Sequence, residues 1–241
     1  MPPTRLLLPR TLLQPRPSGL QNVYHHPIRS FLLSSILPSP PALPPQTLTA
    51  SRRLPYSPAA LYALIADIDS YSAFLPYCSA SRVTSWTARA DPVFGRRWPT
   101  RADLTAGWAG LEQTYTSRVV CVPGSVVEAL SGEGARSGIA PDVLARHGLR
   151  DDGGDGDGDG DGGRGRGSVG NEGVFKTLVT RWTVTPVADS QTTTTQWSDV
   201  DLNIRFQFAN PLYAAVSSAV ADKVAPVMIE AFVERARKVL G

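Results

Sequence analysis

Histidine and cysteine carry much of the catalytic and metal chemistry of proteins, and this sequence holds few of either. The histidines are His25, His26 and His147, and the cysteines are Cys78 and Cys121. Two histidines lie in a proline-rich leader and one in a glycine-rich insert, so Ser-His-Asp and Cys-His catalysis and the usual zinc or iron ligand sets are excluded from the part expected to fold. The cysteines form no CxxC pair, which excludes a disulfide scaffold and a structural zinc site. Such a chain is expected to bind a ligand rather than transform it.

A near-repeat of Asp and Gly from Asp151 to Gly163 offers carboxylates of the kind that bind calcium. An EF-hand loop needs Asp at positions 1, 3 and 5 and Glu at position 12. A loop that starts at Asp155 places Arg166 at position 12, and the next register also lacks a carboxylate there. We therefore interpret the region of about 131–172 as a solvated, disordered, acidic Gly-rich insert without a metal site.

The N-terminal part of the chain has an unusual charge. Residues 1–66 carry six arginines and no Asp or Glu, although the whole chain of 241 residues has a net charge of only +3. An acid-free leader that contains Arg and Ser is typical of mitochondrial transit peptides, and residues 29–34 resemble a matrix-processing signal. Residues 1–45 are therefore predicted to be a mitochondrial transit peptide with a Pro-rich linker. The alternative is a proline-rich arm without a targeting role.

Outside residues 1–66 and the acidic insert 131–172, the chain is nearly neutral, with a net charge of about +1, and 42% of all residues are hydrophobic, which is enough for a core. A nucleic-acid surface needs a clustered basic face, so no nucleic-acid partner is expected. The sequence has no run of about 18 apolar residues, so no membrane-spanning helix is predicted. Residues 46–241 are predicted to form the folded domain.

Alternating apolar and polar residues predict a series of strands in this domain. The clearest strand is 197–208, where Val200, Leu202, Ile204, Phe206 and Phe208 share one face. Weaker patterns predict strands at 46–54, 79–86, 102–108, 115–121, 125–130 and 174–184, the last with Val174, Lys176, Leu178, Thr180, Trp182 and Val184 on one face. The stretch 87–100 is irregular and is left outside the predicted core. One apolar and one wet face are typical of an antiparallel sheet.

Two helices are predicted from their first residues. Ser57 as N-cap and Pro58 at the first position start one helix, and its apolar residues Leu61, Leu64, Ile65 and Ile68 follow at helical spacing. Asn210 and Pro211 start a C-terminal helix of about 29 residues, about 43 Å long, which Pro226 is expected to bend. A helix of this length across a curved sheet often leaves an apolar cavity. The pattern alone leaves a cavity and a plain α+β core equally open.

Several segments follow one another in a known order. They are the opening stretch 56–78, the central hairpin 104–108 and 112–117, the strand with Phe175, Leu178 and Trp182, and the last strand 200–208 with the terminal helix segment 228–235. Together they resemble the mitochondrial coenzyme Q-binding proteins of the START-like, polyketide cyclase-like superfamily. The resemblance implies an α+β START-like helix-grip fold, in which a curved antiparallel sheet wraps around a long C-terminal helix with an apolar cavity. The stretch 87–100, the insert and Pro226 depart from the family pattern.

The resemblance also implies a function. Family members bind coenzyme Q, a polyprenyl quinone, without catalysis and act as a carrier or chaperone that supports respiratory electron transport and coenzyme Q biosynthesis. Coenzyme Q would then be a bound ligand and no separate cofactor is expected. Two alternatives stay open, namely a polyketide cyclase or aromatase-like enzyme and a ribosome-interacting protein like the bacterial relatives.

Candidate ligand-binding residues follow from the resemblance and from the apolar pattern. They are Phe74, Leu75, Pro76, Tyr77, Trp108, Phe206, Phe208, Val220 and Val224. Together with the predicted transit peptide, the resemblance implies a location at the matrix side of the mitochondrial inner membrane. The short aromatic loop 74–77 is expected to gate the cavity and to make peripheral contact with that membrane. The simpler alternative is that these loop residues, like Trp108, only fill the core.

The leader generates the first testable prediction. Protein recovered from mitochondria should begin near residues 29–34, because import proteases remove acid-free leaders of this kind. N-terminal sequencing of the mature protein checks this, and an intact Met1 would contradict it.

Overall fold

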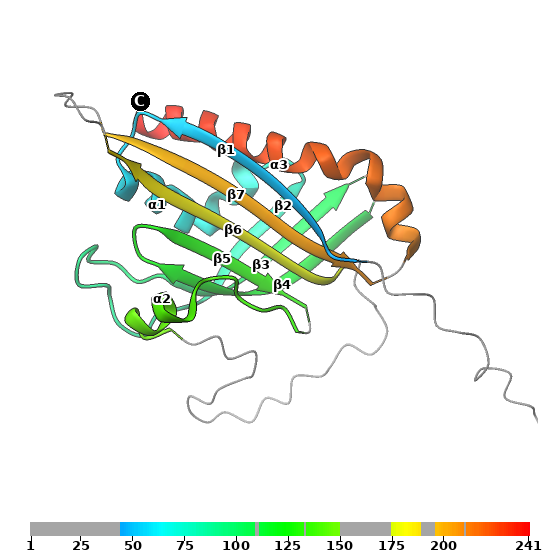
Figure 1. Ribbon diagram of the computed structural model, residues 1–241, viewed down its shortest axis with the longest axis horizontal. Helices are drawn as coiled ribbons and strands as arrows, with labels where there is room; N and C mark the ends of the chain where they lie inside the picture. Colours follow the sequence, from blue (N-terminus) through cyan, green and yellow to red (C-terminus); the bar gives the residue numbers. More distant parts are fainter. Residues whose placement is uncertain (1–43, 109–110, 133, 150–174, 189–195, 210) are drawn as a thin grey trace, which may run out of the picture. The chain divides into compact units, whose positions relative to one another are not determined.

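Seven antiparallel strands form one curved sheet around a long C-terminal helix in the computed structural model (Figure 1). The structure describes residues 44–108, 111–132, 134–149, 175–188, 196–209 and 211–241, so residues 1–43 of the predicted leader lie outside the described residues. The elements are β1 (Gln46–Leu54), α1 (Pro58–Ala66), η2 (Ile68–Ala73), β2 (Cys78–Trp86), β3 (Pro99–Trp108), β4 (Leu111–Val122), β5 (Val126–Ser131), α2 (Pro141–Arg146), β6 (Phe175–Val187), β7 (Trp197–Phe208) and α3 (Pro211–Leu240). This arrangement confirms the predicted fold class.

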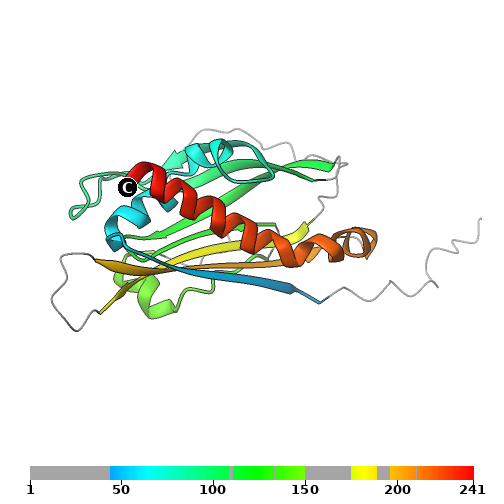
Figure 2. The same cartoon turned by 90° about the horizontal axis from the view of Figure 1, so that it is seen from above.

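The strands lie in the order β1-β7-β6-β5-β4-β3-β2, so the first strand pairs with the last. The alternation predicted for β7 is confirmed, because its five apolar residues from Val200 to Phe208 are all buried. α3 packs against β1 and β7 on this face of the sheet (Figure 2). The pattern of β7 thus marks the face that the long helix covers.

The first helix begins as predicted but ends sooner. The Ser57 hydroxyl accepts a hydrogen bond from the Ala60 amide, and Pro58 occupies the first turn. The α-helix ends at Ala66, and Ile68 belongs to the separate 3₁₀ helix η2. Ile68 is nevertheless buried, so its apolar side chain serves the core from the next element.

The C-terminal helix continues through Pro226 as one element. Figure 1 shows the helix axis bending in the orange, N-terminal part of α3, and the bend expected at Pro226 itself stays a prediction. The predicted cap Asn210 lies outside the described residues. Arg237 and Lys238 in the last turn place positive charge at the negative end of the helix dipole.

The irregular stretch 87–100 contributes to the core, which corrects the prediction that it lies outside. Trp98 is 3% exposed, and its ring meets the ring of Tyr62 edge to face with centroids 4.9 Å apart. Phe94 packs on the same two rings. Buried positions in a loop follow no periodic pattern. The aromatic residue types of Phe94 and Trp98 were therefore the available indication that this stretch could be buried.

Part of the predicted disordered insert is packed against the sheet. Residues 134–149 are described, and α2 within them buries Leu144. Leu144 and Ile139 join Val120, Val122, Leu130 and Val179 in a second apolar cluster, separate from the main core. We call residues 134–149 the outer cap. Residues 150–174, with the Asp-Gly repeat, lie outside the described residues, so their predicted disorder stays a prediction.

A buried ion pair attaches the outer cap to the sheet. Glu128 of β5 is fully buried, and its Oε1 accepts hydrogen bonds from Arg181 Nε and Nη2 at 2.9 and 2.6 Å. The cap supplies two more donors, the Ser137 hydroxyl and the Gly138 amide. Both carboxylate oxygens therefore have donors, as a buried charge requires. A Cβ on residue 138 would lie 1.9 Å from Arg181 Nη2, so a side chain there would displace the guanidinium from its present position.

This ion pair predicts a large effect of one substitution. Glu128→Ala should lower the free energy of unfolding by about 3–5 kcal/mol, because it leaves a guanidinium and a cap amide without their acceptor. The matched control is Asp142→Ala, which removes the ion pair of Asp142 with Arg146 on the cap surface, where both side chains are about 70% exposed. That change should cost less than about 1 kcal/mol. Urea unfolding measures both, and similar losses in the two variants would refute the anchoring role.

Buried acidic groups in the main core predict a loss of stability at alkaline pH. Burial raises the pKa of the Cys121 thiol to about 12, and it also raises the pKa of Tyr62 and Tyr71 above the ordinary value. Below pH 9 both the folded and unfolded thiol keep the proton, whereas above pH 9 only the unfolded thiol releases it. The contribution of the thiol should therefore be lost from about pH 9 towards 12, and that of the two tyrosines above about pH 10, each by about 1.4 kcal/mol per pH unit.

Cys121→Ala isolates the contribution of one thiol. Between pH 7.5 and 10 the wild type should lose about 1.4 kcal/mol more unfolding free energy than the variant. Urea unfolding at both pH values gives this difference directly. Equal losses in the two proteins would contradict the buried, neutral thiol.

Candidate functional site

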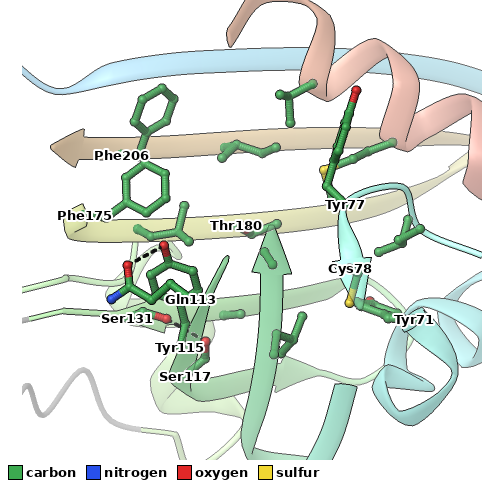
Figure 3. Close-up of a pocket in the computed structure, with 18 of the residues that line it drawn as sticks. Tyr71, Tyr77, Cys78, Gln113, Tyr115, Ser117, Ser131, Phe175, Thr180 and Phe206 are labelled. Carbon is green, nitrogen blue, oxygen red and sulfur yellow. Dashed lines mark hydrogen bonds between the residues drawn. The ribbon is translucent and has the colours of Figure 1, made fainter. Parts of the chain in front are cut away.

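An apolar cavity of about 300 Å³ lies between the sheet, the turn after η2 and α3. Figure 3 shows Tyr77 and Cys78 on one side of it, and Phe175 and Phe206 on the other. Its other apolar lining comes from most of the elements, including Leu48, Ile68, Leu104, Val127, Leu178, Ile204 and Met228. The face of the sheet that packs on α3 is therefore not completely filled, which decides between the cavity and the plain core.

The predicted loop 74–77 divides into residues inside and outside this cavity. Leu75 and Pro76 line it, and Leu75 is only 6% exposed, so its side chain serves the interior. Phe74 lies on the outside, in a separate groove against α3, with its ring 5.7 Å from the ring of Tyr71 and 5.7 Å from the guanidinium carbon of Arg235. Leu75 and Pro76 line this groove as well. These two residues are thus the wall between the cavity and the groove.

Tyr77 marks an exposed part of the cavity lining. Its side chain is 42% exposed although it lines the cavity, and Ala106 and Glu112 at the end of the neighbouring hairpin are also exposed lining residues. Its φ of 66° lies in the left-handed region, which a bulky residue adopts only when its surroundings hold it there. The Gly107 amide, which donates to the Tyr77 carbonyl at 2.9 Å, supplies part of that constraint. We call this region, formed by Tyr77, Ala106, Gly107 and Glu112, the mouth.

The remaining predicted site residues fall into two groups. Phe206, Phe208 and Val224 line the cavity, and both phenylalanines are buried. The side chains of Trp108 and Val220 lie outside the described part of the structure, so their predicted contacts stay predictions.

Several lining residues on β4 and β6 were missing from the predicted site. Gln113, Tyr115 and Ser117 alternate along β4, and this alternation was the available signal. On β6 the predicted face was wrong at one end, because Phe175 lines the cavity and Lys176 is exposed. The pairing of β6 with β7 shifts register between Phe175 and Thr177, so one extra residue reverses the alternation there.

The polar groups of the cavity are mostly paired within the protein. The Tyr71 hydroxyl donates to the Ile65 carbonyl, and the Tyr115 hydroxyl donates to Gln113 Oε1 at 2.9 Å. Ser117 and Ser131 share a hydrogen bond of 2.6 Å between their hydroxyl oxygens (Figure 3). The cavity therefore combines apolar walls with a few fixed polar groups, as small-molecule sites do.

The cavity is nearly free of charge. Among the described residues that line it there is no Lys, Arg or His, and the carboxylate of Glu112 lies at the exposed mouth, where it accepts from the Ser79 hydroxyl. Burial raises the pKa of the Cys78 thiol and of the Tyr71 hydroxyl, which keeps both neutral at physiological pH. Such a space suits an uncharged, largely apolar molecule. No helix in the described residues is long and apolar enough to cross a membrane.

Known proteins share this sequence pattern and this fold. A family profile described as "Polyketide cyclase / dehydrase and lipid transport" matches residues 54–136 and 168–233. The mitochondrial coenzyme Q-binding protein coq10 of Schizosaccharomyces pombe is 30% identical over 188 residues, which cover 78% of this chain and 85% of that protein. The ribosome association toxin RatA of Pseudomonas aeruginosa is 25% identical over 191 residues, which cover 79% of this chain and 95% of that protein.

A solved structure supports the fold. The Zhui aromatase/cyclase from Streptomyces sp. R1128 superposes with a TM-score of 0.51 at 12% identity, over 82% of this chain and 96% of that chain. At this identity the likeness shows the fold alone. The family profile covers more than half of the chain and the coq10 relative covers most of it. The chain therefore belongs to the polyketide cyclase / dehydrase and lipid transport family.

Proposed function

We propose that this chain binds coenzyme Q, or a related polyprenyl quinone, in its cavity without transforming it. The observation that carries the proposal is the uncharged, apolar lining that lies between the curved sheet and α3. The relative from Schizosaccharomyces pombe, which is named a coenzyme Q-binding protein, supports the choice of ligand.

The size of the cavity fits one part of such a ligand. At about 300 Å³ it is at the small end of ligand pockets, which span about 300–1,000 Å³. It suits the quinone ring and the first part of the tail, and the rest of the tail would leave through the mouth beside Tyr77. Each CH₂ group buried in the apolar part contributes about 0.8 kcal/mol to binding.

The proposed setting is the mitochondrion, at the matrix side of the inner membrane. The predicted transit peptide and the mitochondrial name of the coq10 relative support this. A polyprenyl quinone resides in the bilayer, so a carrier or chaperone must touch the membrane surface to exchange it. The exposed Tyr77 at the mouth is the side chain best placed for that contact, whereas the buried Leu75 is not. In this role the protein would support respiratory electron transport and coenzyme Q biosynthesis.

Two other functions compete with this proposal. A cyclase or aromatase needs a positioned acid or base, whereas burial raises the pKa of the Tyr71 hydroxyl and of the Cys78 thiol, which makes both poor acids. The relative named ribosome association toxin RatA favours ribosome binding as the second candidate. Co-sedimentation of the chain with mitochondrial ribosomes tests that candidate directly.

Filling the cavity tests the proposal. Ala129→Phe should raise the Kd for a short-chain ubiquinone at least tenfold, because the new ring occupies the space that Ala129 borders. Filling a void should preserve or raise the thermal stability. Quenching of tryptophan fluorescence measures the affinity, and mass spectrometry identifies lipids that copurify with the wild type.

The matched control places the same ring on the surface. Ala80 lies exposed on β2 and does not line the cavity. Ala80→Phe should leave the affinity for the quinone unchanged. Equal affinity of the Ala129→Phe variant and the wild type, or no quinone binding by the wild type, would overturn the proposed function.

A further inference from the structure

Two serine hydroxyls face each other on the sheet side of the cavity. Ser117 on β4 and Ser131 on β5 are 5% and 7% exposed, and both line the cavity. The pairing between β4 and β5 ends at Arg118 and Leu130, and the two serines are the next residue on each strand. Their oxygens are 2.6 Å apart, and Figure 3 shows the bond between them.

A count of hydrogen atoms shows that this pair has one donor to spare. Each hydroxyl carries one hydrogen, and a single mutual bond uses only one of the two. Among the residues that the structure describes, neither hydroxyl has another hydrogen-bond partner. A buried donor without an acceptor is costly, and native proteins rarely leave one. The spare hydrogen therefore calls for an acceptor within the cavity.

We propose that the Ser117–Ser131 pair donates a hydrogen bond to a carbonyl oxygen of the bound lipid. The ligand then lies head first, with its oxygen-bearing ring against the pair and its hydrocarbon tail towards the mouth. This inference rests on the proposed function and adds the orientation of the ligand and the polar group that selects it. A pure hydrocarbon would fill the same space but leave the donor unpaired.

The position of the pair suits this orientation. Gln113 follows the mouth residue Glu112 on β4, and Ser117 lies four residues further along the strand. At 3.4 Å per residue, Ser117 is therefore about 14 Å further from the mouth than Gln113. A quinone ring at that depth has only apolar walls and fixed dipoles around it. Trp182 also lines the cavity, and its indole nitrogen lacks a partner among the described residues, but that atom is completely buried. The Thr180 hydroxyl and the Gln113 amide also line the cavity, so what distinguishes the serine pair is its burial together with a hydrogen that no described protein acceptor takes.

The test compares two ligands on the full chain. One is a ubiquinone with a ten-carbon tail, and the other is squalene, a polyprenyl hydrocarbon without oxygen. The double variant Ser117→Ala with Ser131→Ala removes both hydroxyls, and loss of a complete hydrogen-bonded pair is nearly neutral for folding. The matched control is Ser198→Ala, which removes a fully buried hydroxyl that donates to the Tyr56 carbonyl away from the cavity.

The double variant should bind the quinone three- to tenfold more weakly, which is the effect of one hydrogen bond. Its affinity for squalene should be unchanged or higher, and Ser198→Ala should alter neither affinity. Equal losses for the two ligands would indicate a general packing effect or a water molecule on the pair and would overturn the inference. Unchanged quinone affinity in the double variant would overturn it while leaving the proposed function intact. A wild type that binds no quinone would overturn both.

A second measurement needs no variant. Quinone labelled with ¹³C at its carbonyls gives an isotope-edited infrared spectrum in complex with the wild type. A hydrogen bond from the serine pair should shift one carbonyl stretch to lower frequency than in an alkane solvent. Two carbonyl bands at the alkane positions would overturn the inference.

Discussion

The structure depends on a mismatch in width between one helix and seven strands. Strands lie about 4.8 Å apart, so a sheet of seven spans about 29 Å, whereas a helix with its side chains is about 10–12 Å wide. α3 lies along β1 and β7, and α1 with η2 reaches only part of the remaining face. Curvature brings the far strands towards the helix without closing the gap. The cavity is the space that this arrangement leaves.

The opposite face of the sheet is buried by a separate apolar cluster. β4 contributes Val119 and Cys121 to the main core, and Val120 and Val122 to the cluster beneath the outer cap. Both faces of this strand are therefore buried at one end. The ion pair of Glu128 fixes the cap from the same side. The strands that border the cavity are therefore also packed on their other face by the outer cap.

Regular periodicity of apolar residues made much of this fold predictable. Where the periodicity is interrupted, the buried residues could not be predicted. The alternation of β7 and the Ser57–Pro58 helix start involve neighbouring residues, whose geometry is local. The register shift near Phe175 reversed a face that the pattern assigned to Lys176, and the burial of Trp98 in a loop follows no period. The meeting of Ser117 and Ser131 depends on the register between two strands, which spacing along the chain does not specify. The apolar and aromatic residue types were therefore enough to suggest lining residues. The Ser117–Ser131 pair could be recognised only from the three-dimensional structure.

If the cavity binds a lipid as proposed, its volume ties the persistence of the protein to the supply of that lipid. An apolar void of about 300 Å³ forgoes on the order of 7 kcal/mol when unfilled, at about 24 cal/mol per Å³. The entire net stability of a typical domain is only about 5–15 kcal/mol. A lipid that fills the void returns much of this energy and binds only the folded chain. Cellular quality control removes chains that unfold often, so the amount of this protein in a cell would follow the abundance of the lipid.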